Sequence, residues 1–325
     1  MSADSATGPS LLDRIIDAYE QLPGVQQKAE IGLVSEVLGA SDWLAGPGDD
    51  AAAVPFDDEH VLAAGEAMWP PFVETDPFGA GIGAVVANVN DIAAMGGRCL
   101  GIIDTIVGPK ELAREALQGM AAAAQRYKVP ILGGHLTVRS GPPALSAFAV
   151  GRARSLLASR NAAAGHALLF ATCLDGVMRP DLPFFRSFES RGDRLPGDVA
   201  LLPELAESGD CVAAKDVSMA GLLGSTAMLL EPSGCGVTID LDVLPVPEGA
   251  PIEHWLSVFP SYGFLLCAPS DRVEATVARF LDRGLTCAQI GVLDDSGSVR
   301  VRAGTHERTV TAVDGITGIT FARAQ

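Results

Sequence analysis

The chain has 325 residues, of which 48% are hydrophobic and 19% are charged, so it has the composition of a globular protein and is long for a single core. Its formal net charge of −17 disfavours nucleic acid or an anionic membrane as a partner, because both repel an acidic surface. No apolar run approaches the roughly 20 residues that span a bilayer. The polar start MSADSATGPS lacks the pattern of a signal peptide. We therefore expect a cytoplasmic protein of two domains.

The 6 cysteines and 5 histidines are scattered along the chain. No two cysteines form a CxxC pair and each lies among apolar residues, so we expect reduced cysteines in the core. The histidine spacing fits no zinc site. The chemistry of the chain is therefore sought among its carboxylates.

Helices and strands alternate in the first half of the chain. Apolar residues at helical spacing predict an amphipathic helix over 10–21, and VLAA (61–64) predicts a short strand. Asp76-Pro77 begins the next helix, with Asp as N-cap and Pro at the first helical position, and Gly96-Gly97 ends it. The elements expected next are a strand over 99–107, a helix over 110–127, and strands over 129–132 and 145–153.

The second half repeats this alternation after a predicted strand over 166–174. Residues 176–198 are rich in Pro, Arg and Asp and predict a long loop, and Ser270 is expected to cap a helix that Gly284 ends. The other expected elements are a helix over 220–230 and strands over 235–241, 264–268, 287–293 and 298–302. This alternation predicts an α/β (α+β) fold with an N-terminal domain over 1–155 and a C-terminal domain over 156–325.

The segment NVNDIAAMGG (88–97) places one carboxylate, Asp91, among small and apolar residues. A buried carboxylate is costly unless a partner compensates its charge. A metal ion, a helix cap or a salt bridge is therefore expected at Asp91.

Further carboxylates stand beside small residues or predicted apolar strands. Asp49 and Asp50 follow a glycine, Glu66 follows a predicted strand, and Asp216 precedes a predicted helix. Hard oxygen ligands from separate loops, completed by water and phosphate oxygens, suit Mg²⁺. Such a cluster would serve phosphoryl transfer, which needs its charge neutralised and its groups aligned. The same residues also fit ordinary turns, and Asp216 fits a helix cap.

GAGIGA (79–84) matches the pattern G-x-G-x-x-A of a dinucleotide-binding fingerprint. The preceding PPFVETDPF (70–78) holds three prolines where that fold needs a buried strand. We therefore expect these glycines to permit close packing of a helix instead. The chain also lacks the phosphate-loop pattern G-x-x-x-x-G-K-[ST].

Several motifs in order resemble the superfamily of aminoimidazole ribonucleotide synthase, which includes thiamine-monophosphate kinase and selenophosphate synthase. The resemblance runs from about residue 28 to 302. The matching segments are GDDAAAV (48–54), NVNDIAAMGG (88–97), ILGGHLTVRSG (131–141), LLASRNAAAG (156–165), and KDVSMAGLLGS (215–225) with GVTIDLDVLP (236–245).

The resemblance implies a two-domain PurM-like fold and a homodimer whose N-terminal sheets join into a barrel. It also implies ATP in a cleft, held through Mg²⁺, and transfer of the γ-phosphoryl group to a small metabolite or ATP-driven activation of one. Asp50, Asp91 and Asp216 match metal ligands, Glu66 stands near another, Asp49 is a further candidate, and Arg160 and Ser218 match ATP contacts. Asn88, Gly133 and Gly134 are candidate cofactor contacts, and Asp91 and His135 are the catalytic candidates.

The chain also departs from the kinase. His135 stands where the kinase has a metal-binding Asp, although selenophosphate synthase has GGH there, and Met219 replaces an acidic position. FPSYGFLL (259–266) stands where the kinase has a substrate motif of the GGED type. These departures disfavour a true thiamine-monophosphate kinase and place the chain in a synthase-related branch. The alternative is a nucleotide-binding protein that has lost catalysis and serves a partner.

Overall fold

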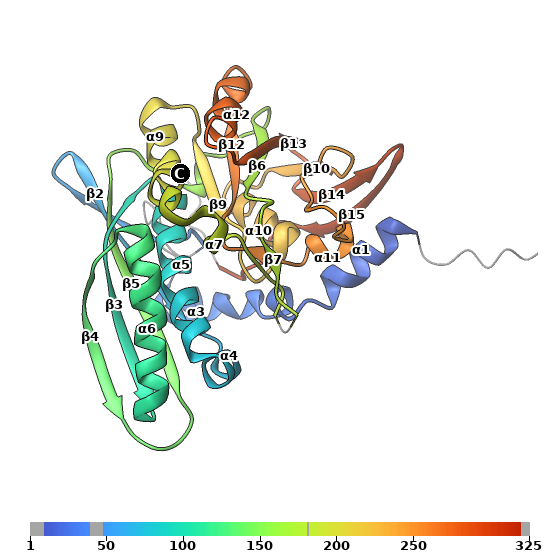
Figure 1. Ribbon diagram of the computed structural model, residues 1–325. Coiled ribbons are helices and arrows are strands. Elements are labelled where there is room, and N and C mark those ends of the chain that lie inside the picture. Colours follow the sequence, from blue (N-terminus) through green and yellow to red (C-terminus); the bar gives the residue numbers. More distant parts are fainter. Residues whose placement is uncertain (1–9, 40–47, 181, 320–325) are drawn as a thin grey trace, which may run out of the picture.

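The computed structural model describes residues 10–39, 48–180 and 182–319, which build two main sheets with helices packed against them (Figure 1). The helical elements are α1 (Leu11–Glu20), α2 (Pro23–Gln26), η1 (Lys28–Gly32), α3 (Leu33–Leu38), α4 (Pro70–Thr75), α5 (Pro77–Ala94), α6 (Lys110–Tyr127), η2 (Ser159–Asn161), α7 (Phe188–Arg191), η3 (Gly192–Arg194), α8 (Leu195–Val199), α9 (Leu201–Ser208), α10 (Gly221–Leu230), α11 (Ile252–Trp255) and α12 (Val273–Leu281). The strands are β1 (Ala52–Phe56), β2 (Glu59–Ala67), β3 (Arg98–Gly108), β4 (Ile131–Val138), β5 (Ala144–Ala153), β6 (Ala167–Thr172), β7 (Val177–Met178), β8 (Phe184–Arg186), β9 (Ala213–Asp216), β10 (Gly236–Asp240), β11 (Phe259–Pro260), β12 (Gly263–Ala268), β13 (Thr286–Asp294), β14 (Ser298–Ala303) and β15 (His306–Ala312).

The N-terminal sheet has the strand order β1-β2-β5-β3-β4. β3 and β4 run parallel and are connected by α6, whereas the other neighbours are antiparallel. Helices α5 and α6 lie side by side against one face of this sheet (Figure 1). The opposite face, which we call the outer face, carries exposed apolar side chains of four strands. They are Val54, Phe56, Val61, Ile103 and Phe148.

Helices α5 and α6 approach each other through glycine. A Cβ atom at Gly81 of α5 would lie 2.1 Å from the Ala116 carbonyl oxygen, and one at Gly119 of α6 would lie 2.0 Å from the Phe78 carbonyl oxygen. The segment before α5 is the helix α4 and not the strand that a dinucleotide fingerprint requires. The prediction that these glycines serve helix packing is therefore confirmed at Gly81.

The second sheet has the order β15-β14-β10-β13-β6-β12-β9, and a small sheet has the order β11-β8-β7. Strands β6 and β12 are buried along their whole length. Helix α1 packs into the core of this half through Leu12, Ile15 and Tyr19, although it precedes the first sheet in the chain. The described cysteines are free, and all except the half-buried Cys99 are buried, as predicted. No helix among the described residues is long and apolar enough to cross a membrane.

The prediction of a long loop over 176–198 is wrong. The segment contains β7, β8, α7 and α8. A distant partner helps to order it, because the buried Asp198 carboxylate accepts a hydrogen bond from Arg283 (2.8 Å) as well as one from Arg191 of the same segment (2.7 Å). The spacing of apolar residues within one segment does not reveal contacts with distant residues.

Two further boundaries differ from prediction. Strand β4 continues to Val138, so Gly133-Gly134 lies inside a strand and not after one. Helix α12 begins at Val273 after Arg272, and Ser270 makes no capping hydrogen bond to it. Strand β15, which pairs with β14, was not predicted, because its mostly exposed residues show no buried apolar alternation.

Candidate metal and nucleotide site

Asp50, Asp91 and Asp216 converge where the two halves of the chain meet. Asp50 lies just before β1, Asp91 in the last turn of α5, and Asp216 at the end of β9. One carboxylate oxygen of each lies within 4.8 Å of those of the other two. We call these three residues the carboxylate cluster. The fold thus brings together three of the metal ligands that the motifs predict.

The carboxylate cluster fits a divalent cation. Two oxygens at about 2.1 Å from one Mg²⁺ ion lie at most about 4.2 Å apart, so the observed spread is close to what one ion requires. The buried amide oxygens of Asn88 and Asn90, which both precede Asp91 on α5, have no hydrogen-bond partner among the described residues. Buried oxygens without partners are a cost that a bound ligand would remove.

The electrostatics of the cluster favour the same interpretation. Burial, together with the carboxylates of Asp216 and Asp50, raises the pKa of Asp91 well above its ordinary value. Burial and the neighbouring Asp50 raise the pKa of Asp216 to about 7. The folded protein therefore holds acidic groups that resist ionisation at neutral pH, and a cation among them would relieve that resistance.

Lys215 supplies a compensating charge inside the cluster. Its ammonium forms an ion pair with Asp50 and lies 3.9 Å from Asp216 Oδ1. Although burial opposes it, the charges of Asp50 and Asp216 raise the pKa of Lys215 above its ordinary value. Asp50 also accepts a hydrogen bond from the backbone N–H of Asp216 (2.9 Å). Asp50 is therefore held in place by the chain, whereas Asp91 receives no such contact among the described residues.

Lys28 is a second cation near the cluster, and the sequence analysis missed it. Burial and the Lys215 ammonium lower the pKa of Lys28, and the charges of Glu66, Asp216 and Asp50 act in the opposite direction. The segment 23–32 is held there because α2 lies against the chain before α10. A Cβ atom at Gly24 would lie only 2.0 Å from the Met219 carbonyl oxygen. No local pattern marks Lys28, since its place depends on this contact between distant segments.

The other predicted contacts lie around the cluster. Asp49 is not part of it, and its Oδ1 accepts a hydrogen bond from the backbone N–H of Ser159 (2.9 Å). This bond places the exposed Arg160 on the segment next to Asp49. The half-buried Ser218 follows Asp216 by two residues, and its N–H donates to Ser225 Oγ (3.1 Å).

Glu66 lies in the same row of paired residues of the N-terminal sheet as Gly134 of the Gly-Gly-His segment (133–135). Glu66 of β2 pairs with Ala147 of β5, which pairs with Asp104 of β3, which pairs with Gly134 of β4. Partial burial raises the pKa of Glu66, while the charges of Lys28 and Lys215 oppose that rise.

His135 lies on the outer-face side of the edge strand β4, opposite Thr105 of β3. Its side chain is exposed, and its Nε2 lies 3.2 Å from Thr137 Oγ1. Gly133 and Gly134 precede it in the same strand. In the strand order, β5 and β3 lie between β2, which carries Glu66, and β4, which carries these residues.

Asn88 and Asn90 connect α5 to both halves of the chain. Asn88 Nδ2 donates to the carbonyl oxygens of Ala84 (2.9 Å) and Ala147 (3.2 Å). Asn90 Nδ2 donates to the carbonyl oxygen of Ser261 (3.1 Å), which belongs to the segment FPSYGFLL. The helix that carries Asp91 is thus hydrogen-bonded to the segment that stands where the kinase has its substrate motif.

The comparisons with known proteins agree with this architecture, which is that of a two-domain PurM-like fold. The family model for the N-terminal domain of AIR synthase related proteins matches residues 48–153, and the model for their C-terminal domain matches residues 179–304. The chain belongs to the family of AIR synthase related proteins. The predicted relationship to the aminoimidazole ribonucleotide synthase superfamily is confirmed.

Among its relatives is "Uncharacterized protein sll0787" of Synechocystis, which is 36% identical over 306 residues that cover 92% of this chain and 94% of that protein. The solved structure "AaThiL complexed with AMPPCP and TMP" has a TM-score of 0.67 at 21% identity and covers 85% of this chain and 93% of that one. The structure "T. maritima PurL complexed with ADP" has a TM-score of 0.78 at 16% identity and covers 97% of this chain and 53% of that one. At these identities the solved structures establish the shared fold.

Proposed function

We propose that this protein binds ATP with Mg²⁺ and uses it to phosphorylate a small metabolite or to activate one. The carboxylate cluster is the observation that supports this proposal most strongly, because its buried acids need a cation. Family members that share the fold have been solved with AMPPCP and with ADP. Phosphoryl transfer asks the protein mainly for charge neutralisation and alignment, which such a site can supply.

In this proposal Asp50, Asp91 and Asp216 hold the metal, with Glu66 and Asp49 beside them. A bound Mg²⁺ would neutralise phosphate charge. Lys28 and Lys215 would direct two further positive charges toward the phosphates. They would thereby offset the repulsion between the anionic ligand and a chain with a net charge of −17.

Further contacts in the proposal follow the family motifs. Arg160 and Ser218 would contact the nucleotide, and Asn88 would offer its free amide oxygen. Gly133, Gly134 and His135 would act on the substrate side. His135 is exposed, and imidazole is a common proton-transfer group in proteins.

We also propose that the protein is a cytoplasmic homodimer with domains over 1–155 and 156–325. The exposed apolar outer face supports the dimer, since a contiguous apolar surface on a folded protein often marks an interface. The partner copy would cover Phe148 and its neighbours on the outer face.

The test of the nucleotide proposal is a thermal-shift titration with AMPPCP, an ATP analogue, in the presence and absence of Mg²⁺. We expect the nucleotide and Mg²⁺ together to raise the Tm of the wild type. Asp91→Asn should remove most of this increase, because the amide cannot supply the negative charge that the cation requires. Asp282→Asn, which changes an exposed acid at the end of α12, is the matched control and should keep it. If Asp91→Asn responds like Asp282→Asn, the metal site is not where we propose.

The alternative is a nucleotide-binding protein without catalysis. The exposed Met219 at a position that is acidic in the kinase favours it. Release of ADP during incubation of the holoprotein with ATP, Mg²⁺ and a panel of metabolites separates the two. Metabolite-dependent ADP release that Asp91→Asn abolishes excludes the alternative, whereas nucleotide binding without any turnover across the panel supports it.

A further inference from the structure

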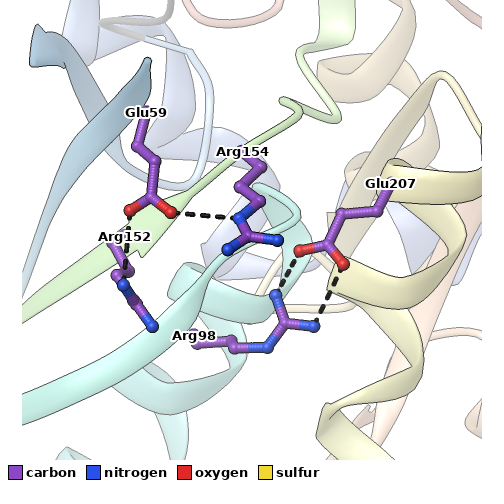
Figure 2. A pocket seen from close by; sticks show the side chains of 5 residues that line it. All are labelled: Glu59, Arg98, Arg152, Arg154 and Glu207. Atoms are coloured by element: carbon purple, nitrogen blue, oxygen red, sulfur yellow. Dashed lines mark hydrogen bonds and ion pairs between the residues drawn. The ribbon is translucent and has the colours of Figure 1, made fainter. Parts of the chain in front are cut away.

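A charged pocket lies at one end of the N-terminal sheet and shares no residue with the carboxylate cluster (Figure 2). It has a volume of about 180 Å³ and is lined by Glu59 of β2, Arg98 of β3, Arg152 and Arg154 at the end of β5, and Glu207 of α9. The lining carries three guanidinium groups and two carboxylates. It is therefore a positive patch on a chain whose net charge is −17.

The arrangement of the arginines does not serve the stability of the sheet. Arg98 and Arg152 are direct partners in the ladder between β3 and β5. Like charges at directly opposite positions destabilise a sheet. Arg154 follows two residues after Arg152 and adds a third positive charge nearby. Such a concentration of like charge at one place is more typical of an anion site than of a sheet edge.

The two carboxylates compensate this charge only in part. Glu59 accepts from Arg154 Nε (3.1 Å) and lies 3.5 Å from Arg152 Nη1, while Glu207 pairs with Arg98 through both oxygens. In Figure 2 the Arg154 guanidinium lies between the two ion pairs, and its terminal nitrogens have no hydrogen-bond or ion-pair partner among the described residues. The hydrogen bond from Arg98 and the charges of Arg154 and Arg152 lower the pKa of Glu207, so all three arginines act on one carboxylate.

We propose that this pocket binds a small phosphate-bearing anion at a site separate from the ATP site. Guanidinium groups match the oxygens of phosphate with paired hydrogen bonds, and here they come from two neighbouring strands and the residue beyond them. The pocket is large enough for inorganic phosphate or pyrophosphate. An anion would compete with Glu207 for Arg98, so its binding changes a contact between the N-terminal sheet and α9. The inference does not depend on the proposed ATP site.

The test is isothermal titration calorimetry of the full chain with inorganic phosphate and with pyrophosphate. EDTA is present to remove divalent cations. We expect saturable binding by the wild type. The double variant Arg152→Gln with Arg154→Gln should weaken it at least about tenfold, because charge-assisted hydrogen bonds are lost. The matched control is Arg114→Gln, which removes an arginine from an exposed ion pair on α6 and should bind like the wild type.

A variant that is expected to tighten anion binding distinguishes an anion site from a purely structural network of ion pairs. Glu207→Gln removes the carboxylate that competes for Arg98, so we expect tighter anion binding by a factor of about three or more. A purely structural ion-pair network would lose stability in this variant without gaining affinity. No saturable binding by the wild type, equal affinities in all variants, or weaker binding by Glu207→Gln would each overturn the proposal.

Discussion

At the scale of single residues, the side chains of the carboxylate cluster are held in defined positions, although burying their charges costs the folded chain stability. Asp91 and Asp216 are buried, and Lys215 pairs with Asp50 more closely than with either of them. Removing charged groups from water is expensive, and one ammonium compensates only part of that cost. A fold selected for stability alone would place apolar residues at these positions. The cluster is therefore better explained by a ligand than by folding.

The raised pKa values determine how stability depends on pH in the absence of metal. Burial and neighbouring carboxylates raise the pKa of Asp91 well above its ordinary value and that of Asp216 to about 7. Such groups hold protons more tightly in the folded chain than in the unfolded chain. Their contribution to stability is therefore complete below about pH 4, and that of Asp216 is lost as the pH rises through about 7.

Bound Mg²⁺ favours the ionised carboxylates, so it should restore stability mainly where the proton has been lost. We expect Mg²⁺ to raise the Tm by at least about 3 °C more near pH 8 than near pH 5.5. Differential scanning calorimetry at the two pH values, with K⁺ at matched ionic strength as the control, measures this difference. An equal Mg²⁺ effect at both values would contradict the assignment of the cluster.

At the scale of elements, the contact between α5 and α6 positions Asp91. The two helices lie side by side in Figure 1, and their backbones approach at Gly81 and Gly119. Gly81→Ala would put a Cβ atom 2.1 Å from the Ala116 carbonyl oxygen, which is backbone and cannot move without displacing α6. We expect a loss of about 2–4 kcal/mol in the free energy of unfolding, measured by urea denaturation.

Gly83→Ala is the matched control on the same helix. Its Cβ atom would meet the flexible terminal methyl group of Met68 at 3.1 Å, and alanine is favoured over glycine in a helix by up to about 1 kcal/mol. This variant should be neutral or more stable than the wild type. If both variants lose the same stability, the close approach of the helices is not what requires Gly81.

The elements also show what a sequence can predict in physical terms. The start of α5 was predicted correctly because its cap is local, and the Gly79 N–H does donate to Asp76 Oδ1 (2.8 Å). The predicted helix over 110–127 coincides with α6 for the same reason, since its apolar period lies within one segment. The order within 176–198 escaped prediction because it depends on ion pairs such as that of Asp198 with Arg283, 85 residues apart.

The residues of the candidate site also differ in whether the sequence reveals them. Asp50, Asp91 and Asp216 stand in recognisable motifs, and the structure brings them together. Lys28 stands in no motif, and it reaches the cluster because Gly24 permits α2 to lie against Met219. Residues that act through long-range packing are therefore the ones that a single sequence does not reveal.

At the scale of the whole molecule, the N-terminal sheet is covered on one side only. Its outer face exposes Phe148 at 46%, Phe56 at 64% and Val54 at 59%, whereas α5 and α6 cover the opposite face (Figure 1). Strand β4 adds an edge with no neighbouring strand among the described residues, and Leu136 and Val138 are exposed on it. Exposed edges and apolar sheet faces promote association. A second copy that presents the same surface would satisfy both features in a closed, symmetric pair.

We therefore expect the wild type to elute with twice the chain mass of 33.6 kDa in size-exclusion chromatography with light scattering. Phe148→Asp should shift the protein to the monomer, because each copy would have to bury a new carboxylate in the apolar interface. Leu281→Asp changes a similarly exposed apolar residue on α12, far from the N-terminal sheet in the chain, and should leave the mass unchanged. A wild type that is monomeric at micromolar concentration, or a Phe148→Asp variant that remains dimeric, would mean that the outer face does not join two copies.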